Sequence, residues 1–454
     1  MAHRPQSVLS RNAPIDKLVG PFQRFTQLEA AGGIVLIIFT VIALVWANSA
    51  WAQSYMDLFS TKFTVGVESF KISKPVLLWV NDGLMAIFFF VVGLEIKREL
   101  LVGELSSPRK AAVPLFAAIG GMLVPAAIFA AINWNKPGIN GWGVPMATDI
   151  AFAVGVLALL GSRVPIALKV FLTALAIVDD LGAVMVIAIF YTEQINMTAI
   201  AVSGGVLVIL TAINLLGVRR PVVYIALGLV LWVAVLKSGV HATIAGVALA
   251  MTIPATMRIS GDRFLTVIRD AVSKFESAAH RGENIAKNQD RQAAVAHLEE
   301  ACEAVQPPLL RLEHALLPFV AFVIMPIFAL ANAGVPLGEG LMSALKNPIA
   351  YGIALGLFFG NQIGITGLTW IAVKTGIGSL PAGVNWRMIH GASALAGIGF
   401  TMSLFIAGLA FDDPAMLDVA KIGILLGSLI SGMFGLIVLM MALRGTDAHE
   451  AAPA

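Results

Sequence analysis

The sequence predicts an all-α polytopic membrane protein, and three observations support that fold class. The 454-residue chain is 58% hydrophobic and has a mean hydropathy of +0.87. Charged residues make up 13% of it, whereas soluble domains carry about 25%. The apolar residues also gather in runs long enough to cross a bilayer. A soluble protein could not bury so much apolar surface, so we expect a lipid bilayer around most of the chain.

The apolar runs predict about twelve transmembrane helices in chain order. They cover residues 30–48, 77–98, 110–132, 144–160, 166–191, 197–217, 221–236, 239–254, 315–334, 349–372, 386–410 and 418–443. Between the first two runs, the stretch "TKFTVGVESFKIS" alternates apolar and polar residues. Such alternation is typical of half-exposed strands, so we expect a small β-hairpin on the outer face.

Basic residues predict the orientation of the bundle. They gather in the N-terminal tail, in the second, fourth, sixth and tenth connections and at the C-terminal end, at Arg4, Arg11, Lys17, Arg24, Lys97, Arg98, Arg109, Lys110, Arg163, Arg219, Arg220, Lys374 and Arg444. Lysine and arginine are enriched in cytoplasmic connections. Both termini are therefore expected in the cytoplasm, although the outer connection 49–76 carries three lysines. The net charge of +3 does not indicate a nucleic-acid partner.

Five parts are expected along the chain: a cytoplasmic tail (1–29), a first membrane part (30–254), an insertion (255–312), a second membrane part (313–443) and a cytoplasmic tail (444–454). Within the insertion, Phe264, Ile268 and Phe275 recur at helical spacing, and "QAAVAHLEEACEAV" predicts a second helix. The stretch "RGENIAKNQD" would be the turn between them. We interpret the insertion as a cytoplasmic helical hairpin, either simply solvated or engaged in a regulatory or oligomeric contact.

Two of the runs contain features that should interrupt a helix. One is "VPMATDIAFAVG", with Thr148 and Asp149, and the other is "LAGIGFTMSLF", with Gly397 and Gly399. Irregular backbone at membrane depth is tolerated only where it is packed in protein or lines a cavity. Two interrupted spans predict a transport site built from crossing half-helices. Asp149 would offset the positive helix ends, while the second span offers no obvious cation for the negative ends.

Asp179 and Asp180 lie side by side in the apolar run "ALAIVDDLGAVMVIAIF". Adjacent helical residues point about 100° apart, so one carboxylate can bind a cation while the other faces a neighbouring helix. Two close carboxylates in a low dielectric cannot easily both be ionised. The pair can therefore hold protons or a hard cation such as Na⁺ or Li⁺. Competition between them would be a physical route to ion exchange.

Other titratable residues allow two interpretations. Glu95 and Glu99 are four residues apart at the cytoplasmic end of their span, and Glu313 begins the ninth span at the same face. They would form an acidic, pH-responsive entrance, or an ordinary helix end paired with basic neighbours. His241 would titrate during transport, or only donate an interhelical hydrogen bond.

Six segments together resemble the NhaA-type bacterial sodium/proton antiporters, over about residues 25–257 and 309–443. They are "FFFVVGLEIKREL", "MATDIAFAVGVLALLGSRVP", "ALAIVDDLGAVMVIAIFYT", "RLEHAL", "ANAGV" and "AGIGFTMSLFIAGLAF". The resemblance implies a secondary antiporter that expels Na⁺ or Li⁺ in exchange for H⁺. It implies no enzyme activity, no cofactor and no organic substrate. It also implies sodium and pH homeostasis at a bacterial inner membrane, as a homodimer joined through the outer hairpin.

The resemblance also implies an architecture and roles for residues. It implies twelve helices, inverted repeats from spans 3–5 and 10–12, two interrupted and crossing helices, and alternating access around a midplane site. By analogy, Asp180 and Asp179 carry Na⁺ or H⁺, with Thr148 and Asp149 beside them. The residues in positions that the family links to the pH response are Glu95, Glu99, Glu313 and His241.

Two departures from the family pattern leave questions open. The family usually has a lysine in the tenth span, where this chain has Asn361 in "LFFGNQIGITG", and residues 258–308 are a long insertion. Without the lysine, like-charge repulsion and desolvation should keep Asp179 protonated to higher pH. One H⁺ per Na⁺ is then expected, and two H⁺ per Na⁺ is the alternative. A sodium-coupled solute symporter of related architecture is the rival function.

Overall fold

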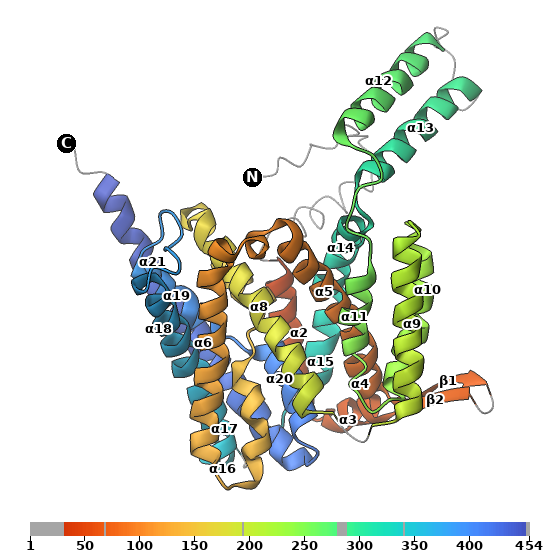
Figure 1. Ribbon diagram of the computed structural model, residues 1–454. Helices are drawn as coiled ribbons and strands as arrows, with labels where there is room; N and C mark the ends of the chain where they lie inside the picture. Colours follow the sequence, from red (N-terminus) through yellow and green to blue (C-terminus); the bar gives the residue numbers. More distant parts are fainter. Residues whose placement is uncertain (1–30, 68–69, 193–194, 279–287, 339–340, 451–454) are drawn as a thin grey trace.

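The computed structural model describes residues 31–67, 70–192, 195–278, 288–338 and 341–450. Most of them form a bundle of long helices, with a two-stranded sheet at one end and a pair of helices projecting from the other (Figure 1). The expected N-terminal tail, residues 1–29, lies outside the described residues, as does most of the expected turn "RGENIAKNQD".

In the first half of the chain, the elements are α2 (Ala31–Ala47), α3 (Ala52–Ser60), β1 (Lys62–Val67), β2 (Phe70–Pro75), α4 (Val76–Trp79), η1 (Val80–Leu84), α5 (Met85–Val102), η2 (Glu104–Ser106), α6 (Pro108–Asn133), η3 (Pro137–Met146), α7 (Ile150–Leu159), η4 (Gly161–Arg163), α8 (Ile166–Phe190), α9 (Met197–Leu215), α10 (Pro221–Leu236) and α11 (Ile244–Thr252). The second half contains α12 (Gly261–Ser277), α13 (Gln289–Val305), α14 (Pro308–Phe319), η6 (Val320–Ile324), α15 (Met325–Asn332), α16 (Leu341–Leu345), α17 (Pro348–Leu355), η7 (Gly356–Gly360), α18 (Asn361–Lys374), α19 (Trp386–Ala396), α20 (Phe400–Ala410) and α21 (Pro414–Glu450).

The described helices have the lengths and apolarity of a polytopic membrane protein. Seven of them are long and apolar enough to cross a bilayer, and three bent helix pairs bring the number to ten if each pair is one span. Three of the long spans contain a π-helical turn, at η1, η6 and η7. The helical membrane fold and the small β-sheet are therefore confirmed.

Two expected spans differ in extent from the helices that form. The run 239–254 is helical only over the nine residues of α11, because Gly239 adopts a left-handed conformation with φ of +83° and the chain turns there. The ninth span begins at Pro308 instead of near residue 315. Proline is favoured at the first position of a helix, so Glu313 lies inside α14.

The predicted β-hairpin is present in the outer connection. Strands β1 and β2 pair in antiparallel register from Lys62 opposite Pro75 to Val67 opposite Phe70. Lys74 on β2 forms an ion pair of 2.6 Å with Asp82, which lies in the π-helical turn η1. The sheet is thereby attached to the beginning of the second span.

Both runs that were expected to be interrupted are broken. Helices η3 and α7 meet at a bend of 43° across residues 147–149, and α19 and α20 meet at a bend of 43° across residues 397–399. Glycine is required at the second break, since a Cβ atom on Gly397 would lie 2.3 Å from the carbonyl oxygen of Leu357. The breaks thus leave irregular backbone in the interior of the bundle, where it is packed in protein.

The insertion forms the helix pair α12 and α13, which projects from the bundle (Figure 1). Each helix has a side-chain cap at its start, Ser260 for α12 and Asn288 for α13. At the other end of the chain, α21 continues to Glu450, past residue 444 where the C-terminal tail was expected to begin.

Candidate ion site at two broken helices

Asp149 lies where the first broken helix resumes. Its Oδ1 atom accepts a 3.0 Å hydrogen bond from the backbone N–H of Phe152, so it caps the start of α7. Its Oδ2 atom accepts a 3.0 Å bond from the backbone N–H of Thr401 and another from the Thr401 hydroxyl, at the start of α20. One buried carboxylate therefore faces the positive ends of two helices, where a negative charge is stabilising.

The negative ends of the broken helices are stabilised by neutral donors. The Thr148 hydroxyl donates to the carbonyl of Ala396, the last residue of α19, at 2.8 Å. The Ser403 hydroxyl donates to the carbonyl of Val144 in η3 at 2.7 Å. The two breaks thus satisfy one another's backbone groups through hydroxyl groups, without a cation at these carbonyls.

Asp179 and Asp180 reach this crossing from the middle of α8. Each residue is 2% exposed. The Oδ2 atom of Asp179 accepts a 2.8 Å hydrogen bond from the backbone N–H of Thr148. Within the described part of the chain, Asp179 Oδ1 and Asp180 Oδ2 are buried without a hydrogen-bond partner. Buried polar atoms normally have a partner, so these two oxygens are unsatisfied acceptors at the crossing.

The electrostatic surroundings of Asp180 are acidic. Its charge interacts with those of Asp179, Glu95 and Asp149. Among the described residues, no three His, Cys, Asp or Glu side chains form a group that could hold a resident metal ion. A transported Na⁺ bound to the aspartates would need backbone carbonyls or water as its remaining ligands. Hard cations are coordinated by such oxygen atoms as well as by carboxylates.

Asn361 is fully buried at the start of α18. Its Nδ2 atom donates to the carbonyl of Leu357 at 3.2 Å, within its own helix. Its Oδ1 atom has no described partner and faces Gly121 of α6. No hydrogen bond between the described side chains joins Asn361 to Asp179.

A second acidic group lies at the end of α5, and Arg98 is its centre. The Arg98 side chain donates to both carboxylate oxygens of Glu313, at 3.0 and 3.2 Å, and to Glu99 at 2.7 Å. Glu99 also accepts a 2.9 Å bond from the backbone N–H of Glu104. Glu95 makes no ion pair with any described residue, but its charge interacts with those of Arg98, Glu99 and Glu313. We call Glu95, Arg98, Glu99 and Glu313 the Arg98 cluster.

His241 lies apart from the Arg98 cluster. Its Nε2 atom forms a hydrogen bond with the carbonyl of Tyr191, directly after the end of α8. This end of α8 lies at one end of the bundle, and the end of α5 that carries the Arg98 cluster lies at the other (Figure 1). The four residues that the resemblance links to the pH response therefore occupy two separate places.

Two residues that hold the site together could not be identified from the sequence alone. Thr401 and Ser403 follow the second break in "GFTMSLF", and their partners lie more than 250 positions away. Near the Arg98 cluster, the basic neighbour Lys97 does not pair with a glutamate but donates to the carbonyls of Met251 and Ile253 at 2.6 Å each.

Comparisons with known proteins identify the family of the chain. The family model described as Na⁺/H⁺ antiporter 1 matches residues 23–439. The chain belongs to the NhaA family of Na⁺/H⁺ antiporters. It is 53% identical to the Na⁺/H⁺ antiporter NhaA of Oleidesulfovibrio alaskensis over 96% of this chain and 97% of that one. It is 48% identical to the Na⁺/H⁺ antiporter NhaA of Koribacter versatilis over 100% of this chain and 99% of that one.

Membership of the NhaA family fixes the class of the protein. The family consists of ion transporters and not of enzymes. The apolar helices agree with a multi-pass membrane location. The rival interpretation as a sodium-coupled solute symporter is not favoured, since the relatives named above are Na⁺/H⁺ antiporters.

Proposed function

We propose that the chain exchanges Na⁺ or Li⁺ for H⁺ by alternating access, with Asp180 and Asp179 as the shared carriers. The observation that supports this most directly is the pair of open oxygens, Asp179 Oδ1 and Asp180 Oδ2, buried beside the broken helices. A protonated carboxyl group is inexpensive to bury, whereas an ionised one needs a compensating cation. The two ions therefore compete for the same atoms, and one site that opens to each side in turn is sufficient.

Asp149 and Thr148 position this site in the proposal. Both oxygens of Asp149 already accept hydrogen bonds from the starts of α7 and α20. Thr148 contacts Asp179 through its N–H and Ala396 through its hydroxyl. Oxygen atoms of Thr148 and Asp149 could also bind the cation. The main role of these two residues in the proposal is to hold the two broken helices together where they cross.

The stoichiometry follows from Asn361 in this proposal. A neutral amide at this position supplies no positive charge to stabilise an ionised Asp179. Asp179 then keeps its proton over the working pH range, and only Asp180 exchanges. One H⁺ moves per Na⁺, and transport is electroneutral.

The Arg98 cluster supplies the pH response in this proposal. The glutamates Glu99 and Glu313 are nearly buried, at 8% and 3% exposed, and share one arginine. Their charges act on Glu95, and the charge of Glu95 acts on Asp180. A change of protonation in the cluster would thus reach the site electrostatically, while His241 only links two segments at the opposite end.

The membrane arrangement is also proposed from the family. It has twelve helices with inverted repeats, both termini in the cytoplasm and a bacterial inner membrane around it. The chain forms a homodimer through the outer hairpin. The hairpin supports this contact because Phe63 and Val65 of β1 are 56% and 50% exposed and because a two-stranded sheet has free edges. No cofactor, nucleic acid or organic substrate is needed.

The test is Na⁺-driven proton movement in proteoliposomes with no other solute present. The wild-type protein should alkalinise or acidify the lumen according to the direction of the Na⁺ gradient. Asp180→Asn should abolish the signal, because it removes both the proton carrier and the cation ligand. Asp412→Asn, at an exposed position after α20, is the matched control and should behave as wild type. Appreciable exchange by the purified Asp180→Asn protein would refute the assignment.

A further inference from the structure

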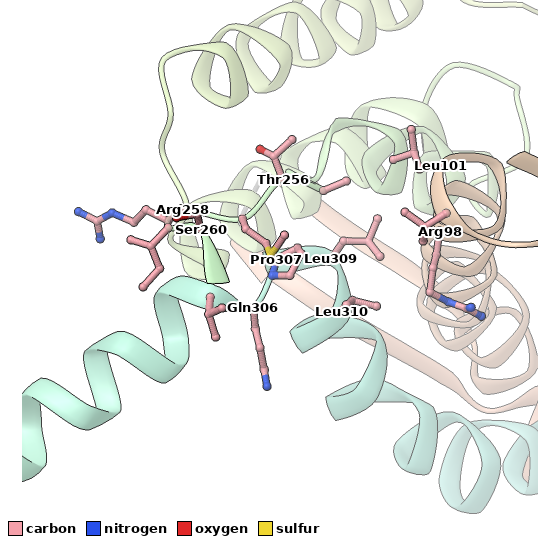
Figure 2. Close-up of a pocket in the computed structure, with 14 residues that line it drawn as sticks. Arg98, Leu101, Thr256, Arg258, Ser260, Gln306, Pro307, Leu309 and Leu310 are labelled. Carbon is pink, nitrogen blue, oxygen red and sulfur yellow. The ribbon is translucent and has the colours of Figure 1, made fainter. Parts of the chain in front are cut away.

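A cavity of about 690 Å³ lies under the helical insertion (Figure 2). It is bounded by the last turn of α5, the first turn of α14 and the two linkers that connect the insertion to the bundle, residues 255–260 and 305–307. Its volume is in the range of sites that hold small molecules. Two of its walls therefore belong to the ends of the insertion, whose helices α12 and α13 project from the bundle.

The cavity walls are apolar and offer no fixed charge to an occupant. They are built largely from Leu101, Val102, Met257, Leu309 and Leu310. None of the described residues that line the cavity is acidic. Arg98 and Arg258 contribute to the walls, but their guanidinium groups point away from the centre (Figure 2). An ionic solute would lose its hydration here without compensation, so the walls fit an uncharged alkyl chain.

The position of the cavity identifies the source of that chain. Leu101 and Val102 end the apolar span Val76–Val102 and are 54% and 78% exposed. Met257, on the opposite wall, is 57% exposed. The apolar surface of the span therefore continues into the cavity at this end of the span. This end faces the cytoplasmic leaflet in the orientation proposed above, on which the inference rests. We propose that the cavity binds one acyl chain of a phospholipid from the cytoplasmic leaflet.

An acyl chain at this point would complete the attachment of the insertion. Two consecutive residues of α5 already contact the segments on either side of the insertion. Lys97 donates to the carbonyl of Ile253, which precedes the insertion, and Arg98 pairs with Glu313, which follows it. The two linkers are joined by the bond from the N–H of Arg258 to the carbonyl of Ala304, at 3.0 Å. The cavity separates these linkers from α5, and a bound chain fills that space with apolar contacts.

Photolabelling of the full-length protein in nanodiscs tests the proposal. The probe is phosphatidylcholine with a diazirine at the end of one acyl chain, and labelled peptides are identified by mass spectrometry. Labelling should appear at Leu309 and Leu310, inside the cavity. Leu310→Trp should fill the cavity and reduce this labelling to background. Val208→Trp, at a 68% exposed position of α9, is the matched control and should leave it unchanged.

Several results would overturn the proposal. They are labelling confined to the rim residues Leu101 and Val102, labelling that persists in Leu310→Trp, and the absence of labelling at Leu309 and Leu310. If Leu310→Trp does not fold, Met257→Trp fills the cavity from the other wall and should give the same loss. Hydrogen exchange gives an independent measurement: phosphatidylcholine added to delipidated wild-type protein should slow exchange in residues 255–260 and 305–310. Unchanged exchange there would contradict the site.

Discussion

Two groups of buried acidic residues are stabilised in different ways in this molecule. At the broken helices, Asp149 is held by helix N-termini, and Asp179 by one backbone N–H. In the Arg98 cluster, Glu99 and Glu313 are held by a single arginine side chain. The first group still has two oxygens without a described partner, whereas the carboxylates of Glu99 and Glu313 are bonded.

In our proposal, this difference separates a site for the transported ions from a site that controls transport. Neutral hydroxyl and N–H donors fix the crossing without neutralising Asp180, and a proton or Na⁺ would then balance its charge in turn. In the Arg98 cluster, Arg98 already pairs with Glu99 and Glu313, so a cation gains less by binding to those two carboxylates. Three substitutions test this separation.

Asp149→Ala should have the largest effect, on both stability and transport. The change removes the acceptor for the starts of α7 and α20, and the loss of a cap costs about 1 kcal/mol at each helix. We expect a lower midpoint of thermal unfolding in detergent and strongly reduced exchange. Asp149→Asn retains one oxygen acceptor and should be intermediate. An Asp149→Ala protein with wild-type stability would show that the crossing is held by other contacts.

Glu95→Gln should change the pH dependence of transport and leave the maximum rate nearly unchanged. The substitution removes a negative charge that acts on Asp180. A carboxyl group beside fewer negative charges releases its proton more readily, so activity should begin at lower pH. The measurement is Na⁺-driven proton flux between pH 5 and 9, with Glu104→Gln as a control at a half-buried neighbour whose carboxylate lies outside the Arg98 cluster. If the pH profiles of Glu95→Gln and the wild-type protein coincide, the charge of Glu95 does not affect proton release from Asp180.

Asn361→Lys should have the smallest effect and tests the stoichiometry. An added positive charge near Asp179 would favour its ionised form, so activity should extend to lower pH and become more dependent on voltage. The measurement is Na⁺-driven proton flux with the membrane potential set by K⁺ and valinomycin. A wild-type rate that rises steeply with voltage would contradict electroneutral exchange. An unaltered pH profile in the variant would show that residue 361 does not act on Asp179.

Local sequence signals predicted the positions of the breaks and of the hairpin. Thr148 with Asp149, and Gly397 with Gly399, are residues that a continuous membrane helix does not favour, and the alternation in residues 61–73 is a strand pattern. The twelve-helix count and the inverted repeats remain predictions. The short extent of α11 was missed because its apolar run includes a turn at Gly239.

Contacts between remote segments could not be predicted from the sequence. Asp149 accepts two bonds from Thr401, and Arg98 joins Glu99 to Glu313 across 214 positions of the chain. These pairs depend on which helices become neighbours, and the spacing of residues in one segment carries no such information. The candidate carboxylates could therefore be identified from the sequence, whereas the structure was needed to show which of them already have hydrogen-bond or ion-pair partners.

Proton release on Na⁺ binding would show whether the two ions share Asp180. Purified protein in a weakly buffered detergent solution is titrated with NaCl while the pH is recorded, with choline chloride as the ionic control. If Na⁺ and H⁺ compete for Asp180, the wild-type protein releases protons in a saturable manner, and Asp180→Asn releases none although it remains folded. Saturable Na⁺ binding without proton release, or undiminished release from Asp180→Asn, would contradict the account.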